Sequence, residues 1–199
     1  MRVGHAVGQR SGPRVVVDSD PHGSQAGRPA GNRDLTRPPK DPGERFASRY
    51  IDEQNTPQFP FGYGLSYTDF SYGGPEISAK KLSAKTLNAE LRKNSADAKP
   101  VLTVTANVSN TGKMAAEEVV QLYVRLQGTS VEEPVRKLKG FQRVALAPGE
   151  TKKVTFSLGA DSFALWDIRN EYTVEPSIVH IWVSPDSSRG EAVDLEIAD

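Results

Sequence analysis

Three residues near the N-terminus have side-chain types and a spacing that could bind a metal ion. Asp18, Asp20 and His22 alternate along the chain, and carboxylate and imidazole groups are common ligands of divalent metals. The neighbouring residues are rich in glycine and proline and provide no rigid element that would hold three ligands in one geometry. We therefore predict no metal site and no cofactor here.

Two doublets of adjacent carboxylates are the next candidates, because hydrolytic sites often use acidic groups as general acids and bases. Glu117 and Glu118 form the first doublet, and Glu132 and Glu133 form the second. Neighbouring side chains of a strand point to opposite faces, so neither doublet places its two carboxylates together. We interpret all four groups as solvated charges and predict no catalytic residue among them.

Two single residues also have a structural interpretation that is simpler than a catalytic one. His180 lies in an apolar run over residues 178–183, where a histidine at the edge of the core is expected. Ser66 follows Gly64, but the second glycine of the G-x-S-x-G nucleophile motif is absent. Neither residue is predicted to be catalytic.

Four aromatic side chains could form a platform for sugars, which stack on exposed rings. They are Tyr123, Trp166, Tyr172 and Trp182. A β-sandwich of this size also needs large rings in its core, and tryptophan is highly buried on average. The sequence favours the core interpretation.

The composition is that of one ordinary domain with a tail. Of the 199 residues, 37% are hydrophobic and 25% are charged, and the formal net charge is zero. Residues 1–50 contain nine Lys and Arg against five Asp and Glu, which is too small an excess for a nucleic-acid-binding face. No apolar run approaches the roughly 18 residues of a membrane span. We expect neither nucleic acid nor a membrane as a partner.

The chain also offers little information about its cellular compartment. It contains no cysteine, so a disulfide framework and a thiolate site are both excluded. The N-terminal residues carry charges but lack the apolar region of a secretory signal peptide. The localisation is therefore left open.

Residues 58–72 have the most regular pattern in the chain. Large apolar side chains occupy every second position from Phe59 to Tyr67, and the positions between them are Pro60, Gly62, Gly64 and Ser66. An extended chain would carry rings on one face and nearly bare backbone on the other. The segment is then either a clamp between two packed bodies or an aromatic edge strand of one domain. As a clamp, an isolated chain would self-associate through Phe59, Phe61 and Tyr63.

From about residue 75 onward the pattern predicts short strands separated by turns. Apolar and polar residues alternate in the runs 102–108, 120–126, 154–158 and 193–197. Further strands are expected at 138–146, with a bulge at Gly140, in a hairpin over 163–174, and at 178–183, which is apolar on both faces. About seven strands at this spacing predict an all-β, immunoglobulin-like two-sheet sandwich. Residues 78–99 fit a strand followed by either a long loop or a short helix.

Four longer motifs resemble one enzyme family. They are PFGYGLSYT at 60–68, NVSNTGKMAAEEVVQLYVR at 107–125, EEPVRKLKGFQRVALAPGETKKVTFSL at 132–158 and FALWDIRNEYTVEP at 163–176. In this order they are similar to the C-terminal part of glycoside hydrolase family 3, the β-glucosidase and β-xylosidase group, with its fibronectin type III-like domain. The resemblance extends over roughly residues 27–185.

The resemblance implies three parts: an irregular remnant of the family's α/β sandwich domain over 1–57, an aromatic clamp or linker over 58–74, and a fibronectin type III-like domain over 75–199. It also implies that Arg28, Pro29 and residues 48–50 belong to a domain that reaches the sugar site. The family's nucleophilic Asp lies on a barrel of about 250 residues, and its acid/base Glu lies on the α/β domain. Both precede the matched region.

The block before Gly27 departs from the family pattern. It begins with a matching Gly8-Gln9, but between Arg10 and Gln25 the resemblance is lost, and it returns at Gly27-Arg28-Pro29. Two compensating shifts of reading frame and genuine divergence both explain this. Translation of the other frames of the gene distinguishes them.

The sequence therefore predicts the non-catalytic, stabilising part of a β-glucosidase-like glycoside hydrolase of carbohydrate metabolism. Its expected partners are the catalytic domains of such an enzyme, in cis, and the chain alone is expected to be inactive. A free-standing carbohydrate-binding or protein-interaction module is the alternative. Members of the family are often periplasmic or secreted.

Overall fold

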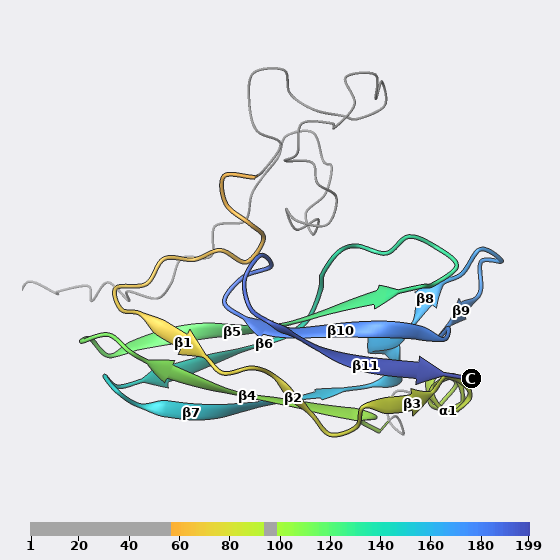
Figure 1. Ribbon diagram of the computed structural model, residues 1–199, viewed down its shortest axis with the longest axis horizontal. Coiled ribbons are helices and arrows are strands. Elements are labelled where there is room, and N and C mark those ends of the chain that lie inside the picture. Colours follow the sequence, from red (N-terminus) through yellow and green to blue (C-terminus); the bar gives the residue numbers. More distant parts are fainter. Residues whose placement is uncertain (1–56, 94–98) are drawn as a thin grey trace, which may run out of the picture.

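The computed structural model describes residues 57–93 and 99–199, which form a two-sheet β-sandwich (Figure 1). The first sheet is built on β4 (Leu102–Asn110). One edge of β4 pairs antiparallel with β1 (Phe70–Tyr72) and β2 (Glu76–Ile77), and its other edge pairs antiparallel with β7 (Thr151–Leu158). Two short strands therefore share one edge of β4.

The second sheet has five strands in the order β3 (Lys81–Ser83), β11 (Ala192–Ala198), β10 (Ser177–Ser184), β5 (Ala116–Gln127) and β6 (Lys137–Leu146). Its neighbours are antiparallel except β3 and β11, which are parallel. The helix α1 (Ala84–Leu91) follows β3, and the 3-10 turn η1 (Ala160–Phe163) follows β7. A separate hairpin joins β8 (Leu165–Trp166) to β9 (Tyr172–Thr173).

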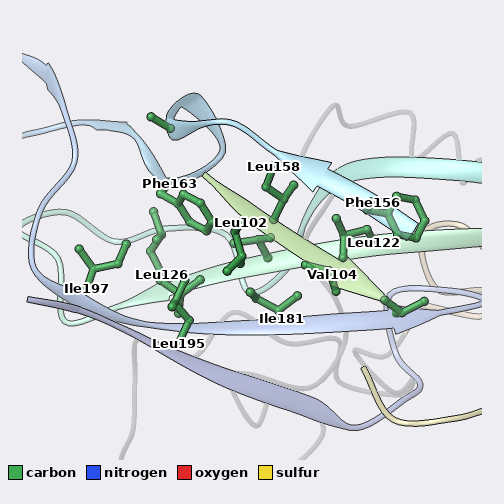
Figure 2. Packing of buried hydrophobic residues seen from close by; sticks show 14 of the residues in the cluster. Leu102, Val104, Leu122, Leu126, Phe156, Leu158, Phe163, Ile181, Leu195 and Ile197 are labelled. Atoms are coloured by element: carbon green, nitrogen blue, oxygen red, sulfur yellow. The ribbon is translucent and has the colours of Figure 1, made fainter. Parts of the chain in front are cut away.

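The core lies between the two sheets because their strands alternate with a period of two. In β4 the inward side chains Leu102 and Val104 are buried, and in β10 Ile181 is completely buried. Phe163 of η1 closes one end of this core, as Figure 2 shows. The all-β sandwich predicted from the sequence is confirmed.

The strands expected from the alternating runs are all present, and one predicted detail and one open question are resolved with them. The register between β5 and β6 shifts opposite Gly140, which is the expected position of the bulge. Residues 78–99, for which a loop and a helix were both considered, contain β3 and then α1. Residues 94–98 lie outside the described part.

Strand β10 differs from its sequence pattern, which is apolar on both faces. Only the odd-numbered positions face the core, whereas Ile178 is 42% exposed and Trp182 is half-buried. The described residues therefore cover one face of this strand fully and the other only in part.

Residues 58–67 are not the extended strand that their alternation suggested. The amide of Tyr63 donates a hydrogen bond to the carbonyl of Pro60 at 3.0 Å, which closes a turn, and Gly62 adopts a φ of 80°. A positive φ at glycine interrupts an extended chain, so the even spacing of the rings does not produce one aromatic face. Of residues 58–72, only Phe70–Tyr72 forms a strand at the edge of a sheet. The boundary between residues 74 and 75 stays a prediction.

Within residues 57–93 and 99–199, no group of three or more His, Cys, Asp or Glu side chains is placed to hold a metal ion. The helices of this part are also too short or too polar to cross a membrane. The Asp18, Asp20 and His22 triplet lies outside the described residues.

Candidate functional site

An open cleft of about 270 Å³ lies where residues 62–72 cross β5 and the loop that follows β10. Its walls combine rings with polar groups, and the main lining side chains are Tyr63, Phe70, Tyr72, Glu118, Gln121 and Arg189. A concave surface with a few converging polar groups is the usual starting point for a candidate site.

The side chain of Gln121 fastens the aromatic segment to the sandwich. Its Nε2 donates hydrogen bonds to the carbonyl of Gly62 at 2.9 Å and to the carbonyl of Pro185 at 2.5 Å. Its Oε1 accepts a hydrogen bond from the hydroxyl of Tyr123 at 2.6 Å. Gln121 is buried, so these three bonds are made away from bulk water and each partner depends on them.

Gly62 is required at this contact for two reasons. Its φ of 80° is unfavourable for other residues, and an added Cβ would lie 2.2 Å from Oε1 of Gln121 and 2.5 Å from the hydroxyl oxygen of Tyr123. The next residue before it is held as well, because the amide of Ser187 donates to the carbonyl of Phe61 at 2.9 Å. The absence of a side chain at Gly62 therefore allows a close approach, as predicted. The groups that approach are the side chains of Gln121 and Tyr123, whereas main chain was expected.

The loop after β10 is held in shape by the buried carboxylate of Asp186. Asp186 accepts hydrogen bonds from the amide and hydroxyl of Ser188 and from the amide and Nε of Arg189. Burial alone would raise the pKa of Asp186, but the bonds from Ser188 and the pairing with Arg189 outweigh burial and lower that pKa. This loop is thus a rigid wall of the cleft.

Arg136 joins the same wall from the segment before β6. Its Nη1 donates to the carbonyl of Arg189 at 2.6 Å, and its guanidinium carbon lies 4.2 Å above the centre of the Trp182 ring. Trp182 is therefore half-buried beneath a cation, and it is not a free platform.

A second buried carboxylate, Glu118, lies at the floor of the cleft. The hydroxyl of Tyr72 donates a hydrogen bond to Oε1 of Glu118 at 2.6 Å, which connects β1 to β5. Burial raises the pKa of Glu118, and the hydrogen bond from Tyr72 and the charge of Arg189 offset this only in part. Chemically, Glu118 is a single shielded carboxyl that holds its proton more tightly than an exposed glutamate.

We predict that Glu118→Gln makes the chain more stable at neutral pH and weakens its pH dependence. The folded-state pKa lies above the ordinary value of 4.5, so the folded chain binds more protons than the unfolded one. Wild-type stability should therefore fall as the pH rises above about 4.5 through the folded-state pKa, and glutamine should remove this slope while keeping a partner for Tyr72. Urea unfolding at a series of pH values measures the pH dependence of the free energy of unfolding.

Glu117→Gln is the matched control, because the Glu117 side chain is exposed and pairs with Arg143 at 2.9 Å on the opposite face of β5. It should leave the wild-type slope in place. A Glu118→Gln chain with an unchanged pH profile would contradict the assignment.

The sequence-based expectation of solvated carboxylates is thus right for Glu117 and wrong for Glu118. Tyr72 of β1 shields Glu118, and it lies 46 residues before Glu118 in the sequence. In the other doublet, Glu132 is exposed and Glu133 forms an ion pair with Lys137. Glu117 and Glu118 have different partners on opposite faces of β5, so this doublet does not place its two carboxylates at one site.

Two further candidates have structural partners. His180 lies on the outer face of its sheet, where its Nδ1 is 2.6 Å from Oδ1 of Asp194 and its Nε2 is 2.7 Å from Oε1 of Gln127. Ser66 is exposed at the rim of the cleft, and its hydroxyl oxygen accepts a hydrogen bond from the Thr68 amide at 3.4 Å. Arg28, Pro29 and residues 48–50 lie outside the described part.

The four aromatic residues divide into buried and exposed ones. Tyr123 is completely buried, but on the outer face of β5 against Phe61 rather than between the sheets, whereas Trp166 is 60% exposed and Tyr172 is 45% exposed. The core interpretation is wrong for this second pair, because their hairpin β8–β9 stands outside both sheets.

Sequence reasoning missed Gln121, Asp186 and Arg189 as the groups that organise the cleft. One signal was present: Gln121 and Tyr123 have the outward parity of β5, and a large ring at an outward position indicates that another segment covers that face. The covering segments are residues 61–63 and the loop after β10.

The fold is that of a fibronectin type III-like domain, and the model of that domain family matches residues 118–187. The chain is 35% identical over 153 residues to the periplasmic beta-glucosidase of Salmonella typhimurium, covering 77% of this chain and 18% of that protein. It is 40% identical over 139 residues to a beta-xylosidase of Formosa agariphila, covering 70% and 17%.

A crystal structure of the beta-glucosidase from Listeria innocua in complex with glucose superposes with a TM-score of 0.66 at 31% identity, over 82% of this chain and 21% of that one. The chain is homologous to the C-terminal part of glycoside hydrolase family 3 enzymes and carries the fibronectin type III-like domain of that family. It spans about 18% of the length of the Salmonella relative, in which the matching region is a small part of a larger glycosidase. The family expected from the motifs is confirmed.

Proposed function

We propose that the chain is the non-catalytic module of a β-glucosidase- or β-xylosidase-like glycosidase and that it presents residues 59–67 to the catalytic domains in cis. The observation that carries this proposal is the attachment of Gly62 to Gln121, which fixes the middle of the segment while side chains on both sides of it remain exposed. The division into residues 1–57, 58–74 and 75–199 is part of the same proposal.

The exposed side chains of the segment support a docking role. Phe59 is 37% exposed, Leu65 is 70% exposed and Tyr67 is 81% exposed. Phe61, by contrast, is half-buried, and the centre of its ring lies 6.5 Å from that of the Tyr123 ring, with the two planes at 82°. Fully burying one large apolar side chain contributes about 1.5–3 kcal/mol, so we assign docking to Phe59, Leu65 and Tyr67.

The carboxylates of the cleft support a non-catalytic role. Retaining glycoside hydrolysis uses a nucleophile and an acid/base carboxyl about 5–5.5 Å apart, with free access to the sugar. The carboxylate of Asp186 is buried and already accepts several hydrogen bonds, and Glu118 is bonded to Tyr72. We therefore place the chemistry on the catalytic domains of the parent enzyme.

The test is to add the purified chain to the Salmonella typhimurium relative from which the matching region has been deleted. We expect a complex in sedimentation and a longer half-life of aryl β-glucoside hydrolysis by the mixture, with no hydrolysis by the chain alone. The double variant Leu65→Ser, Tyr67→Ser should bind at least about a hundredfold more weakly, because two anchors that each contribute about 1.5–3 kcal/mol are lost.

Phe141→Ser is the matched control, because Phe141 is a 64% exposed ring on β6, outside the docking segment. Equal binding by the double variant and this control would contradict the docking assignment, and hydrolysis by the chain alone would contradict its non-catalytic role. Sedimentation of the chain alone also tests the self-association predicted through Phe59, Phe61 and Tyr63, which stays a prediction.

A further inference from the structure

The β8–β9 hairpin carries two exposed rings side by side. Trp166 and Tyr172 are direct partners across the hairpin, with ring centres 5.3 Å apart and planes at 43°. They are 60% and 45% exposed, respectively. Two large rings that are exposed on a folded surface and in contact with each other form one continuous aromatic surface.

The turn of this hairpin is held by a buried carboxylate. Oδ1 of Asp167 accepts hydrogen bonds from the amides of Arg169 at 2.8 Å and Glu171 at 2.9 Å, and its Oδ2 accepts one from Nε of Arg169 at 3.0 Å. The bond from the Glu171 amide, together with those from Arg169, lowers the pKa of Asp167 despite its burial. The turn is therefore rigid although its side chains are mostly exposed.

The base of the hairpin is fastened by the helix α1. Oδ1 of Asn88 accepts hydrogen bonds from the Thr173 hydroxyl and the Val174 amide, both at 2.9 Å, and its Nδ2 donates to the Val174 carbonyl at 2.8 Å. With both ends of the hairpin fixed, the two rings are ordered before any ligand arrives. A preordered surface loses little entropy on binding.

The position of the hairpin separates it from the docking segment. In Figure 1 the strands β8 and β9 lie at the end of the sandwich opposite β1. Residues 62–72, which line the cleft, lead into β1. The hairpin also carries the exposed residues Ile168, Arg169 and Glu171, and the Tyr172 hydroxyl donates a hydrogen bond to the carbonyl of Asp161 at 3.5 Å. This is a narrow aromatic strip within a polar surface, rather than a broad apolar interface.

We propose that Trp166 and Tyr172 form a binding site for a β-linked glucan chain. A β-glucopyranosyl ring has its substituents equatorial and its axial C–H groups on its two faces, and these groups carry a partial positive charge that suits the negative face of an aromatic ring. The Arg169–Glu171 ion pair lies in the turn of the same hairpin and offers donors and an acceptor of the kind that bind sugar hydroxyl groups. The site would hold a polymer near the enzyme without taking part in hydrolysis.

Tryptophan fluorescence gives a direct test because the chain contains only two tryptophans. In a Trp182→Phe chain, the emission comes from Trp166 alone. We expect cellohexaose or laminarihexaose to change this emission saturably and the α-linked maltohexaose to leave it unchanged. By calorimetry on the otherwise wild-type chain, Trp166→Ala and Tyr172→Ala should each weaken binding roughly tenfold, and Trp166→Phe should retain it.

Phe141→Ala is the control, since it removes an exposed ring that stands outside the hairpin. It should bind the β-linked hexasaccharides as the wild type does. No saturable change with either β-linked sugar, equal binding of maltohexaose, or full binding by Trp166→Ala would each overturn the proposal. The docking variants Leu65→Ser and Tyr67→Ser should bind the sugars normally, so a failure of the docking proposal would be recognised separately.

Discussion

Replacing Gly62 by alanine should detach residues 61–63 from the sandwich and lower the free energy of unfolding by about 3 kcal/mol. The positive φ costs about 1–2 kcal/mol for a residue with a Cβ. The new Cβ would also push away Oε1 of Gln121 and the hydroxyl of Tyr123, and each buried group that loses its partner costs about 1–3 kcal/mol. Urea unfolding measures the loss, and hydrogen exchange at the Ser187 amide, which donates to Phe61, reports the detachment.

Gly128→Ala is a close control for this substitution. Gly128 has a φ of 89°, similar to that of Gly62, but no atom lies within 4 Å of its Cβ position. It should therefore show only the backbone effect, about 1–2 kcal/mol, with normal protection of the Ser187 amide. Equal losses at the two glycines would mean that the contact with Gln121 contributes nothing.

Replacing Gln121 by leucine should lower the free energy of unfolding by a similar amount, because it removes the other partner of the Gly62–Gln121 contact. Leucine has nearly the same volume, but it leaves the Gly62 and Pro185 carbonyls and the Tyr123 hydroxyl without this partner. At about 1–3 kcal/mol for each buried group, and with relaxation toward water, we expect a total loss of about 3 kcal/mol. Urea unfolding and hydrogen exchange at Ser187 measure this variant as well.

The same change at Gln142 provides the comparison. Nε2 of Gln142 donates to the Thr155 carbonyl at 2.6 Å, but this bond is exposed and water can replace it. Gln142→Leu should therefore cost about 1 kcal/mol or less. If the two leucine variants unfold at the same urea concentration, the three bonds of Gln121 are not the attachment described above.

The strands of the sandwich could be predicted because the alternation of apolar and polar side chains along each strand determines which face is buried. In β4 and β7, side chains alternate between a dry face and a wet one, so a simple count with period two finds each strand from its own residues. The bulge at Gly140 followed from the same local reasoning. Neither prediction needed to know which strands become neighbours.

The cleft could not be predicted in this way because its groups come from distant parts of the chain. Glu118 is buried by Tyr72, which lies 46 residues before it, and Gln121 bonds to Gly62, which lies 59 residues before it. The extended form expected for residues 58–67 failed at Gly62, where a contact with β5 selects a conformation that the alternation of side chains does not encode. The exposure of Trp166 and Tyr172 was predicted wrongly because each lies in a strand of only two residues, which is too short to show an alternation of buried and exposed positions.

The attachment of Gln121 to main-chain carbonyls has a consequence for building chimeric glycosidases. Every residue type has a main-chain carbonyl group, so the hydrogen bonds from Gln121 depend on where the backbone lies. They do not depend on the side chains next to Gly62. An engineer could then exchange the outward residues at positions 59, 65 and 67 to suit a new partner and keep only Gly62 unchanged. Under the proposed docking role, the contact at Gly62 would hold the segment in place while the residues that meet the partner are changed.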